Sequence, residues 1–194
     1  TERPRHSLDV AWTDLDNDGW LDLIFANDGD PHTVYYGTGT GGLAAEPGWQ
    51  ARATGFEGNT IYWGDLNDDG WLDVVISDNA QQDGAGGVRA WCGPSLSMCW
   101  RSEDDPALQS AVSLEDIDGD GDLDLAAGSW WGTVRIYEND GGLSPEPVWQ
   151  TTIDTSVIEA LVWEDVDGSD AVLVTVEGEG LVRLPGRPIS VSGG

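Results

Sequence analysis

The sequence is poor in positive charge. Its eight basic residues are all arginine, 36 residues are acidic, and the formal net charge is −28. Nucleic acid phosphates and anionic lipid headgroups repel such a chain. We therefore expect no nucleic acid and no anionic membrane surface among its partners, and we expect a neutral or cationic ligand rather than an acidic one.

Signatures of membrane insertion and of catalysis are also missing. No run approaches the ~18 apolar residues of a membrane-spanning helix, so no membrane insertion is expected. The only histidines are His6 and His32, both expected at the surface. No His, Lys or Ser stands in a nucleophile pattern. The sequence therefore names no catalytic residue.

Cysteine is scarce, and its two occurrences lie close together. Cys92 and Cys99 are flanked by tryptophans and separated by a Gly-Pro pair and two serines, which is typical of a hairpin tip. We predict a disulfide, with free thiols or a zinc site as weaker alternatives, because zinc would need further ligands. A disulfide would indicate an oxidising, extracytoplasmic setting.

A nine-residue acidic pattern dominates what is present. It begins at residues 14, 65 and 116, with an oxygen-bearing side chain at positions 1, 3 and 5, glycine at 6 and aspartate at 9. Ca²⁺ takes about six to eight oxygen ligands, and alternate acidic residues on a tight loop can converge on one ion. Glycine permits the turn that folds the loop back. Position 7 would add a backbone carbonyl, so the pattern predicts three calcium loops.

The residues around these loops exclude an EF-hand. Position 12 of an EF-hand is a bidentate glutamate followed by a helix, whereas here it is Phe25, Ile76 and Ala127. The flanking runs are short, apolar and partly β-branched, as in buried strands. Each loop is therefore predicted to connect one strand to the next.

The loops mark an internal repeat of 51 residues. A fourth, decayed copy begins at Asp165 and Asp167, but it has Ser169 at position 5 and Asp170 at position 6, so we expect it to be empty or weak. A period near 50 with four strands per unit is typical of propeller blades. We predict one all-β domain, a β-propeller of four blades at approximately 7–57, 58–108, 109–157 and 158–194. A closed four-bladed monomer is favoured over half of an eight-bladed homodimer or a fragment of a larger propeller.

Aromatic residues fall into periodic and non-periodic sets. Two periodic sets are predicted to form inter-blade core: Trp12, Trp63 and Trp163, and Trp49, Trp100 and Trp149. The features that break the repeat symmetry are candidates for a ligand surface: Trp130, Trp131, Tyr35, Tyr36 and the cysteine hairpin.

The acidic nonapeptide between two hydrophobic strands, repeated at this spacing, resembles the FG-GAP/VCBS repeat family. That family includes the propeller heads of integrin α subunits, fungal propeller lectins and many secreted bacterial surface proteins. The Phe-Gly…Gly-Ala-Pro signature is absent, so the chain is more similar to the VCBS branch, and the family's propellers usually have seven or eight blades. The resemblance implies one Ca²⁺ per loop, held by Asp14, Asp16, Asp18, Trp20 and Asp22; by Asp65, Asn67, Asp69, Trp71 and Asp73; and by Asp116, Asp118, Asp120, Asp122 and Asp124, the position-7 residues through their carbonyls.

These observations together predict a calcium-stabilised binding or adhesion module, secreted or at the cell surface. Its ligand would be a glycan, as for a lectin, or an extracellular protein. An enzyme acting on polysaccharides and a purely structural self-assembly unit are the alternatives, because carboxylate pairs that form only in three dimensions are invisible in the sequence.

Overall fold

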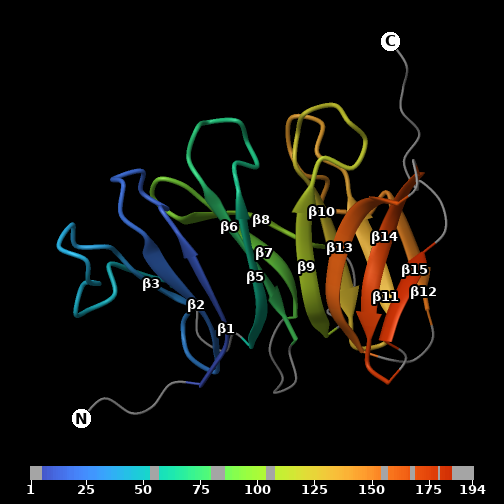
Figure 1. Ribbon diagram of the computed structural model, residues 1–194, viewed down its shortest axis with the longest axis horizontal. Coiled ribbons are helices and arrows are strands. Elements are labelled where there is room, and N and C mark those ends of the chain that lie inside the picture. The colour runs from blue at the N-terminus through green and yellow to red at the C-terminus, as the bar shows by residue number, and fades with distance from the viewer. Residues whose placement is uncertain are drawn as a thin grey trace.

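The computed structural model describes residues 6–52, 57–79, 86–103, 108–153, 157–166, 169–178 and 180–184. Across these residues the chain forms strands, turns and loops, and no helix (Figure 1). None of them forms a helix long and apolar enough to cross a membrane. The all-β class is confirmed.

Strands that are consecutive in the sequence pair antiparallel into small sheets, each of which we call a blade. Blade 1 consists of β1 (His6–Thr13), β2 (Asp22–Asp28), β3 (Thr33–Tyr35) and β4 (Trp49–Gln50). Blade 2 consists of β5 (Gly58–Gly64), β6 (Asp73–Asp78), β7 (Gly87–Cys92) and β8 (Ser97–Arg101). Blade 3 consists of β9 (Gln109–Glu115), β10 (Asp124–Ser129), β11 (Thr133–Tyr137) and β12 (Trp149–Thr152).

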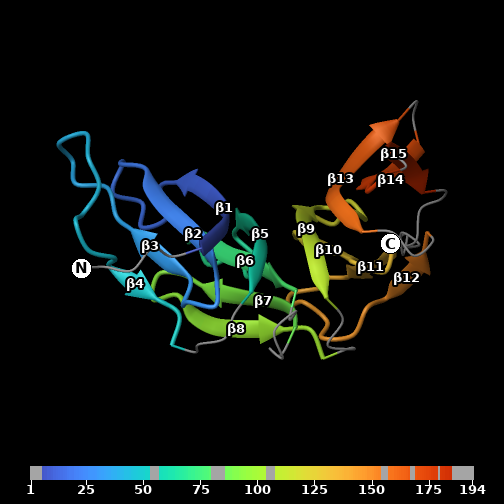
Figure 2. The ribbon, with the colours of Figure 1, turned by 90° about the horizontal axis from the view of Figure 1, so that it is seen from below.

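Blade 4 has three strands among the described residues: β13 (Ile158–Val166), β14 (Ser169–Val176) and β15 (Gly180–Leu184). The fourth strand expected for this blade is not among its described residues, which end at Leu184. The first strands of the four blades lie nearest to a common axis, and the blades follow one another around it (Figures 1 and 2). The four-bladed propeller is confirmed.

Each of three hydrophobic clusters fills the space between two consecutive blades. Ile24 and Val34 of blade 1 meet Ile76 of blade 2 in the first, Val75 of blade 2 meets Leu125 of blade 3 in the second, and blades 3 and 4 share the third. Alternating side chains on each strand therefore serve two different interfaces.

The junction between blade 4 and blade 1 differs from these three. Close strand contacts join β1 to β5, β5 to β9 and β9 to β13, whereas Val10 on β1 remains 49% exposed. The expected closed ring therefore has three packed interfaces, and the fourth lacks equivalent packing among the described residues.

The two tryptophan series have different surroundings. Trp49, Trp100 and Trp149 are half-buried against the inter-blade clusters, as predicted. The core prediction was wrong for Trp12 and Trp63, which are 52% and 39% exposed. The side chain of Trp163 lies outside the described residues.

His32 is not a surface residue, contrary to the prediction. It is 1% exposed, and its Nδ1 accepts a hydrogen bond from the backbone N–H of Asn27 at 3.1 Å. Its ring meets that of Trp91 edge to face, with the centroids 5.5 Å apart. Histidine was assigned to the surface because of its polarity, but a neutral imidazole can be buried when it has a partner.

The predicted disulfide is present. Cys92 at the end of β7 is bonded to Cys99 on β8, with the two Cα atoms 5.7 Å apart. The bridge spans the hairpin that joins the third and fourth strands of blade 2, and no free cysteine is left in the chain.

Candidate metal centres

The three acidic segments form the loops between the first and second strands of blades 1, 2 and 3. We call them loop 1 (residues 14–22), loop 2 (65–73) and loop 3 (116–124). All three lie at the same edge of the molecule, the upper edge in Figure 1. Position 6 has a positive φ in each loop, at Gly19, Gly70 and Gly121 (89°, 85° and 105°), as the sequence required.

Loop 1 is folded by hydrogen bonds from its own backbone to its carboxylates. Asp14 accepts the N–H groups of Asp18 and Gly19 at 3.0 and 2.9 Å, one on each oxygen. Asp18 in turn accepts the N–H of Trp20 at 2.8 Å. These bonds turn the carboxylates toward the inside of the loop.

Loops 2 and 3 repeat the same bonds at the same positions. In loop 2, Asp65 accepts the N–H groups of Asp69 and Gly70 at 3.1 and 2.8 Å. In loop 3, Asp116 accepts those of Asp120 and Gly121, both at 3.1 Å. Three independent stretches of sequence therefore give one loop conformation.

In loops 1 and 3 the carboxylates at positions 1, 3 and 5 come together. One carboxylate oxygen from each of Asp14, Asp16 and Asp18 lies within 4.8 Å of the others, and Asp116, Asp118 and Asp120 form the same cluster. Loop 2 has an amide at position 3, and the Oδ1 of Asn67 accepts the N–H of Asp69 at 3.1 Å. Each carboxylate keeps unused lone pairs. A donor set made only of oxygen suits a hard cation such as Ca²⁺.

The aspartate at position 9 has a second, structural task that the sequence did not reveal. Asp22, Asp73 and Asp124 are fully buried. One oxygen of each accepts the N–H of position 2 in its own loop, at 2.9 to 3.0 Å. The other oxygen accepts an N–H that follows the third strand, from Gly37, Gly93 or Asn139, at 2.8 to 2.9 Å. The aspartate at position 9 therefore joins each loop to the segment that follows the third strand of the same blade.

Burial first, and then the charges of neighbouring carboxylates, raise the pKa values of carboxyl groups in these loops. Burial raises the pKa of Asp124 to about 6; hydrogen bonds from Asn139 and Ile117 oppose this rise, and the charges of Asp118 and Asp120 add to it. Burial also raises the pKa of Asp16, with further contributions from the charges of Asp22 and Asp18. Position 9 is thus electrostatically close to the oxygen cluster, and a bound cation would relieve the repulsion among these groups.

Asn139 connects neighbouring loops and was not singled out from the sequence. Its Nδ2 donates to the carbonyl of Leu66 in loop 2 at 2.8 Å and to that of Leu123 in loop 3 at 3.0 Å. Its counterparts in blades 1 and 2 are Gly37 and Gly93. A Cβ at Gly37 would lie 2.7 Å from the Cβ of Trp20, and one at Gly93 would lie equally close to Trp71. In the sequence, blades 1 and 2 have glycine here and tryptophan at position 7, whereas blade 3 has Asn139 and Asp122.

The fourth repeat forms a hairpin instead of a loop. β13 continues to Val166 and β14 begins at Ser169, with Asp165 opposite Asp170 in the strand register. Asp167 lies outside the described residues, as do the side chains of Asp165 and Asp170. Strand pairing through this segment leaves no nine-residue loop for an ion of the kind expected in loops 1 to 3.

The structure does not place the four aromatic candidates of the ligand surface in one pocket. Trp131 is 59% exposed. Trp130 is half-buried and lines a cavity of about 390 Å³ at the axis, formed by the first strands of all four blades. Tyr36 belongs to blade 1, where it packs on the first core cluster, and burial and then the charges of Asp16 and Asp22 raise its pKa. Tyr35 meets Phe25 edge to face at 5.8 Å.

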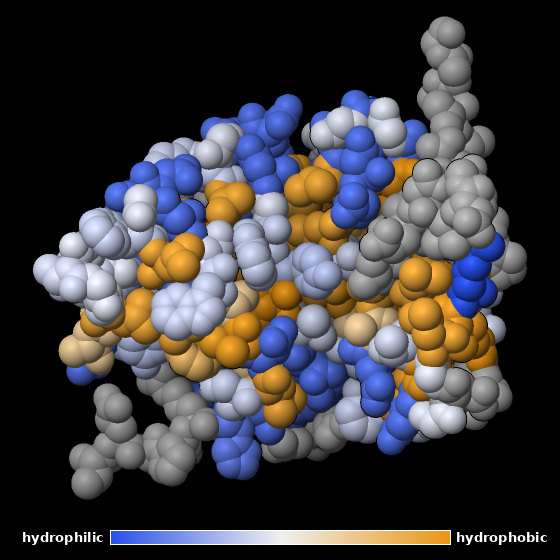
Figure 3. Space-filling view, in the orientation of Figure 1, coloured by the Kyte–Doolittle hydropathy of each residue, from blue (hydrophilic) through white to orange (hydrophobic). Residues whose placement is uncertain are grey.

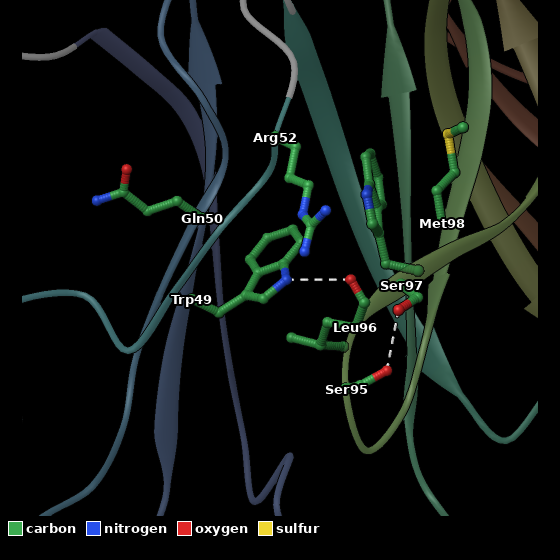
Figure 4. Close-up of a pocket in the computed structure, with 8 residues that line it drawn as sticks. Trp49, Gln50, Arg52, Ser95, Leu96, Ser97 and Met98 are labelled. Carbon is green, nitrogen blue, oxygen red and sulfur yellow. Dashed lines mark hydrogen bonds between the residues drawn. The ribbon is translucent and has the colours of Figure 1, made fainter.

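A second cavity, of about 460 Å³, lies between β4 and the disulfide hairpin (Figure 4). Trp49 forms one wall, and its Nε1 donates to the carbonyl of Leu96 at 3.0 Å across the blade boundary. Arg52, Ser95, Ser97 and Met98 also line the cavity. The sequence pointed to the cysteine hairpin as a symmetry-breaking feature, but it gave no sign that Trp49 lies beside it.

Comparisons with known proteins agree with this architecture. Residues 14–76 match the family model of an FG-GAP-like repeat, which confirms the resemblance over loops 1 and 2. A search of curated protein sequences gave no match. Among solved structures, the chain is similar to a chain in the crystal structure of BBS1N in complex with ARL6DN, soaked with mercury. The identity is 12%, the TM-score is 0.62, and the match covers 92% of this chain and 54% of that one.

The lead-soaked crystal of the same complex gives 11% identity and a TM-score of 0.63 at the same coverage. At these identities the likeness concerns the fold alone. The chain spans about half the length of the solved chains that it matches.

Proposed function

We propose that this chain, in which residues 14–76 are an FG-GAP-like repeat, is a calcium-stabilised binding or adhesion module that works outside the cytoplasm. The observation that carries the calcium part is the threefold recurrence of one loop conformation, with three converging carboxylates in loops 1 and 3. The Cys92–Cys99 disulfide supports the location, because such bonds persist in oxidising compartments.

Each ion would be held by the side chains at positions 1, 3, 5 and 9 of loops 1, 2 and 3. A bound Ca²⁺ supplies charge neutralisation and a cross-link, not reaction chemistry. Because the ion binds only the folded loop, each occupied site stabilises the protein by about 2.7 kcal/mol at 100-fold excess over Kd. The resident role of the metal is therefore to hold the acidic edge of the propeller rigid.

For the ligand we propose a neutral glycan bound where Trp130 and Trp131 meet the axial cavity. Trp130 lines the cavity, and the following residue, Trp131, offers an aromatic side chain that is 59% exposed. Polar groups of Asn59, Thr60 and Ser110 line that cavity from blades 2 and 3. Sugars combine an apolar face with hydroxyl groups, so a ring surface beside hydrogen-bonding side chains suits them.

A glycan array in the presence of Ca²⁺ tests this part of the proposal. Trp131→Ala should lose the binding that the wild type shows, with its melting temperature unchanged, because this side chain is mostly in solvent. Trp63→Ala is the matched control, since Trp63 is also exposed, at 39%, but neither it nor an adjacent residue lines the axial cavity, whereas Trp131 follows Trp130. Equal binding by the two variants would contradict the placement of the ligand.

The same samples distinguish a binding module from an enzyme. We expect no release of reducing ends or of unsaturated sugar when the chain is incubated with any polysaccharide that it binds. Calcium-dependent release would instead favour the enzymatic alternative. A pair of carboxylates would then have to be sought near the axial cavity, where Asp9 and Glu159 lie.

A further inference from the structure

We propose that the open face of blade 1 is a docking surface for blade 4 of a second copy of this chain. In each blade, one face of the sheet points toward the preceding blade, and we call it the leading face. The other face points toward the following blade, and we call it the trailing face. At each of the three packed interfaces, the trailing face of one blade covers the leading face of the next.

The first strand shows that the leading face of blade 1 is built for burial. Val10 occupies the position of Ile61, Val112 and Leu161 in the other blades, as their strand registers show. Those three side chains are 4%, 1% and 2% exposed, whereas Val10 is 49% exposed. Blade 1 thus has an apolar residue of the same kind that no other blade among the described residues covers.

The second and third strands give the same result. Leu23 and Phe25 on β2 are half-buried, whereas their counterparts in blade 2, Val74 and Ile76, are each 1% exposed. Tyr35 on β3 is half-buried, and its counterpart in blade 3, Tyr137, is fully buried. Each of these leading positions of blade 1 thus keeps an aliphatic or aromatic side chain.

The apolar surface on the leading face of blade 1 continues beyond the sheet to the edge where the acidic loops lie. Trp12 and Leu21 are 52% and 59% exposed, and they line a hollow of about 320 Å³ together with Trp20 and Leu43. In blade 2 the counterpart of Leu21 is Leu72, which packs against the cluster between blades 1 and 2. Figure 3 shows hydrophobic residues reaching the surface over blade 1. Contiguous apolar surface of this kind is typical of an interface.

The same chain has the complementary face exposed at its other end. In blade 3 the trailing positions Ala126, Val134 and Ile136 are at most 3% exposed, because blade 4 covers them. The equivalent positions in blade 4 include Leu181, which is 67% exposed, and Leu173, which is half-buried. Both open faces occur in one molecule, so they do not cover each other within it.

We choose a second copy as the partner because its blade 4 has an open trailing face. That face can cover the leading face of blade 1 in the same way as one blade covers the next at the three packed interfaces within the chain. Two such contacts related by a twofold axis would cover both open faces of both copies and complete a ring of eight blades. The net charge of −28 opposes association. On the trailing face of blade 4, however, the exposed residues include Leu181 and Arg183, so this face is not uniformly acidic.

Multi-angle light scattering of the whole chain in Ca²⁺, over a series of concentrations, tests the proposal. The wild type should approach twice the chain mass of 20.7 kDa as its concentration rises. Val10→Asp on the open face of blade 1 and Leu181→Asp on that of blade 4 should each weaken dimerisation at least about tenfold, because an interface that buries an unpaired carboxylate is disfavoured. The matched control is Val148→Asp, since Val148 is 45% exposed but lies on neither face. It should dimerise like the wild type.

Circular dichroism in the near ultraviolet would show that each variant is folded, which their exposed positions lead us to expect. A wild type that stays at 20.7 kDa at every concentration would overturn the proposal. A dimer that Val10→Asp weakens and Leu181→Asp leaves intact would also overturn it, because blade 4 would then not be the partner. Equal weakening by Val148→Asp would do the same, because the effect would then come from added charge alone.

Discussion

The carboxylate of Asp73 accepts the backbone N–H of Gly93 at 2.9 Å and that of Leu66 at 3.0 Å. Leu66 belongs to loop 2, and Gly93 follows Cys92 in the disulfide hairpin. One fully buried side chain therefore joins the acidic loop to the third strand of its blade. The same relationship recurs at Asp22 and Asp124, which makes position 9 a structural part of the blade as well as a ligand candidate.

Asp73→Ala is predicted to destabilise the protein by about 2–5 kcal/mol, because two buried N–H groups lose their acceptor. The loss of unfolding free energy should be larger in Ca²⁺ than in chelator. Without the ion, the substitution also removes the repulsion between Asp73 and the charges of Asp65 and Asp69, and this offsets part of the loss. Urea unfolding under both conditions measures it. Asp68→Asn is the control, because Asp68 is exposed in the same loop with φ 59°, which asparagine tolerates. A loss for Asp73→Ala no greater than the control's would contradict the bracing role.

His32 predicts a loss of stability in mild acid. Burial, and secondarily the charge of Arg89, lowers the pKa of His32 from 6.5 to about 3. Between these values the unfolded chain binds a proton that the folded protein does not. Stability is therefore full above pH 6.5 and falls as the pH drops toward 3, by about 1.4 kcal/mol per pH unit from this group.

His32→Gln should flatten the dependence of unfolding free energy on pH between pH 6.5 and about 5, above the range in which most carboxyl groups titrate. His6→Gln is the control, because the His6 side chain is 81% exposed. Identical slopes for the wild type and His32→Gln would show that His32 is protonated in the folded protein.

Removal of the disulfide should lower stability without removing metal sites. The bridge closes a short loop, with a sequence separation of 7, so replacing both cysteines by serine should cost about 2–3 kcal/mol. Thermal unfolding with and without Ca²⁺ measures this cost and the calcium-dependent shift separately. An unchanged shift is expected, because no cysteine is among the proposed ligands. A vanished shift would mean that the hairpin holds loop 2 in shape.

The sequence was sufficient for the parts of this fold that depend on local chemistry. Alternating carboxylates and a glycine predicted the loops, and the 51-residue period predicted the blades. Short apolar runs placed strands on both sides of each loop, and the structure has β1 and β2, β5 and β6, and β9 and β10 there. Each of these features is encoded within one repeat, where neighbouring residues determine the conformation.

Features that depend on packing between repeats could not be predicted. Periodicity gave Trp12 and Trp63 the same core assignment as Trp49, but the burial of each ring depends on what the other repeats place against it, and these two stay 52% and 39% exposed. Burial of His32 depends on Trp91 from the next blade, which is distant in the sequence. The inter-loop bonds of Asn139 likewise cross from blade 3 to blade 2.

Loss of a single ligand should remove a single site. Asp69→Ala takes away the carboxylate at position 5 of loop 2, which accepts the N–H of Trp71 at 2.9 Å. The two remaining loops lie in other blades, so their affinities should be nearly unchanged. Isothermal titration should find one Ca²⁺ fewer than in the wild type, whereas Asp68→Asn should keep the full number. Weakening of all sites together would indicate one cooperative cluster instead of independent loops.

The number of calcium ions bound by the wild-type chain tests the central claim most directly. After exhaustive chelation, isothermal titration with Ca²⁺ should reveal three sites, one for each of loops 1, 2 and 3, and saturation should raise the melting temperature. A stoichiometry of one or none, or a melting temperature that Ca²⁺ does not change, would contradict the account of this propeller as a calcium-stabilised module.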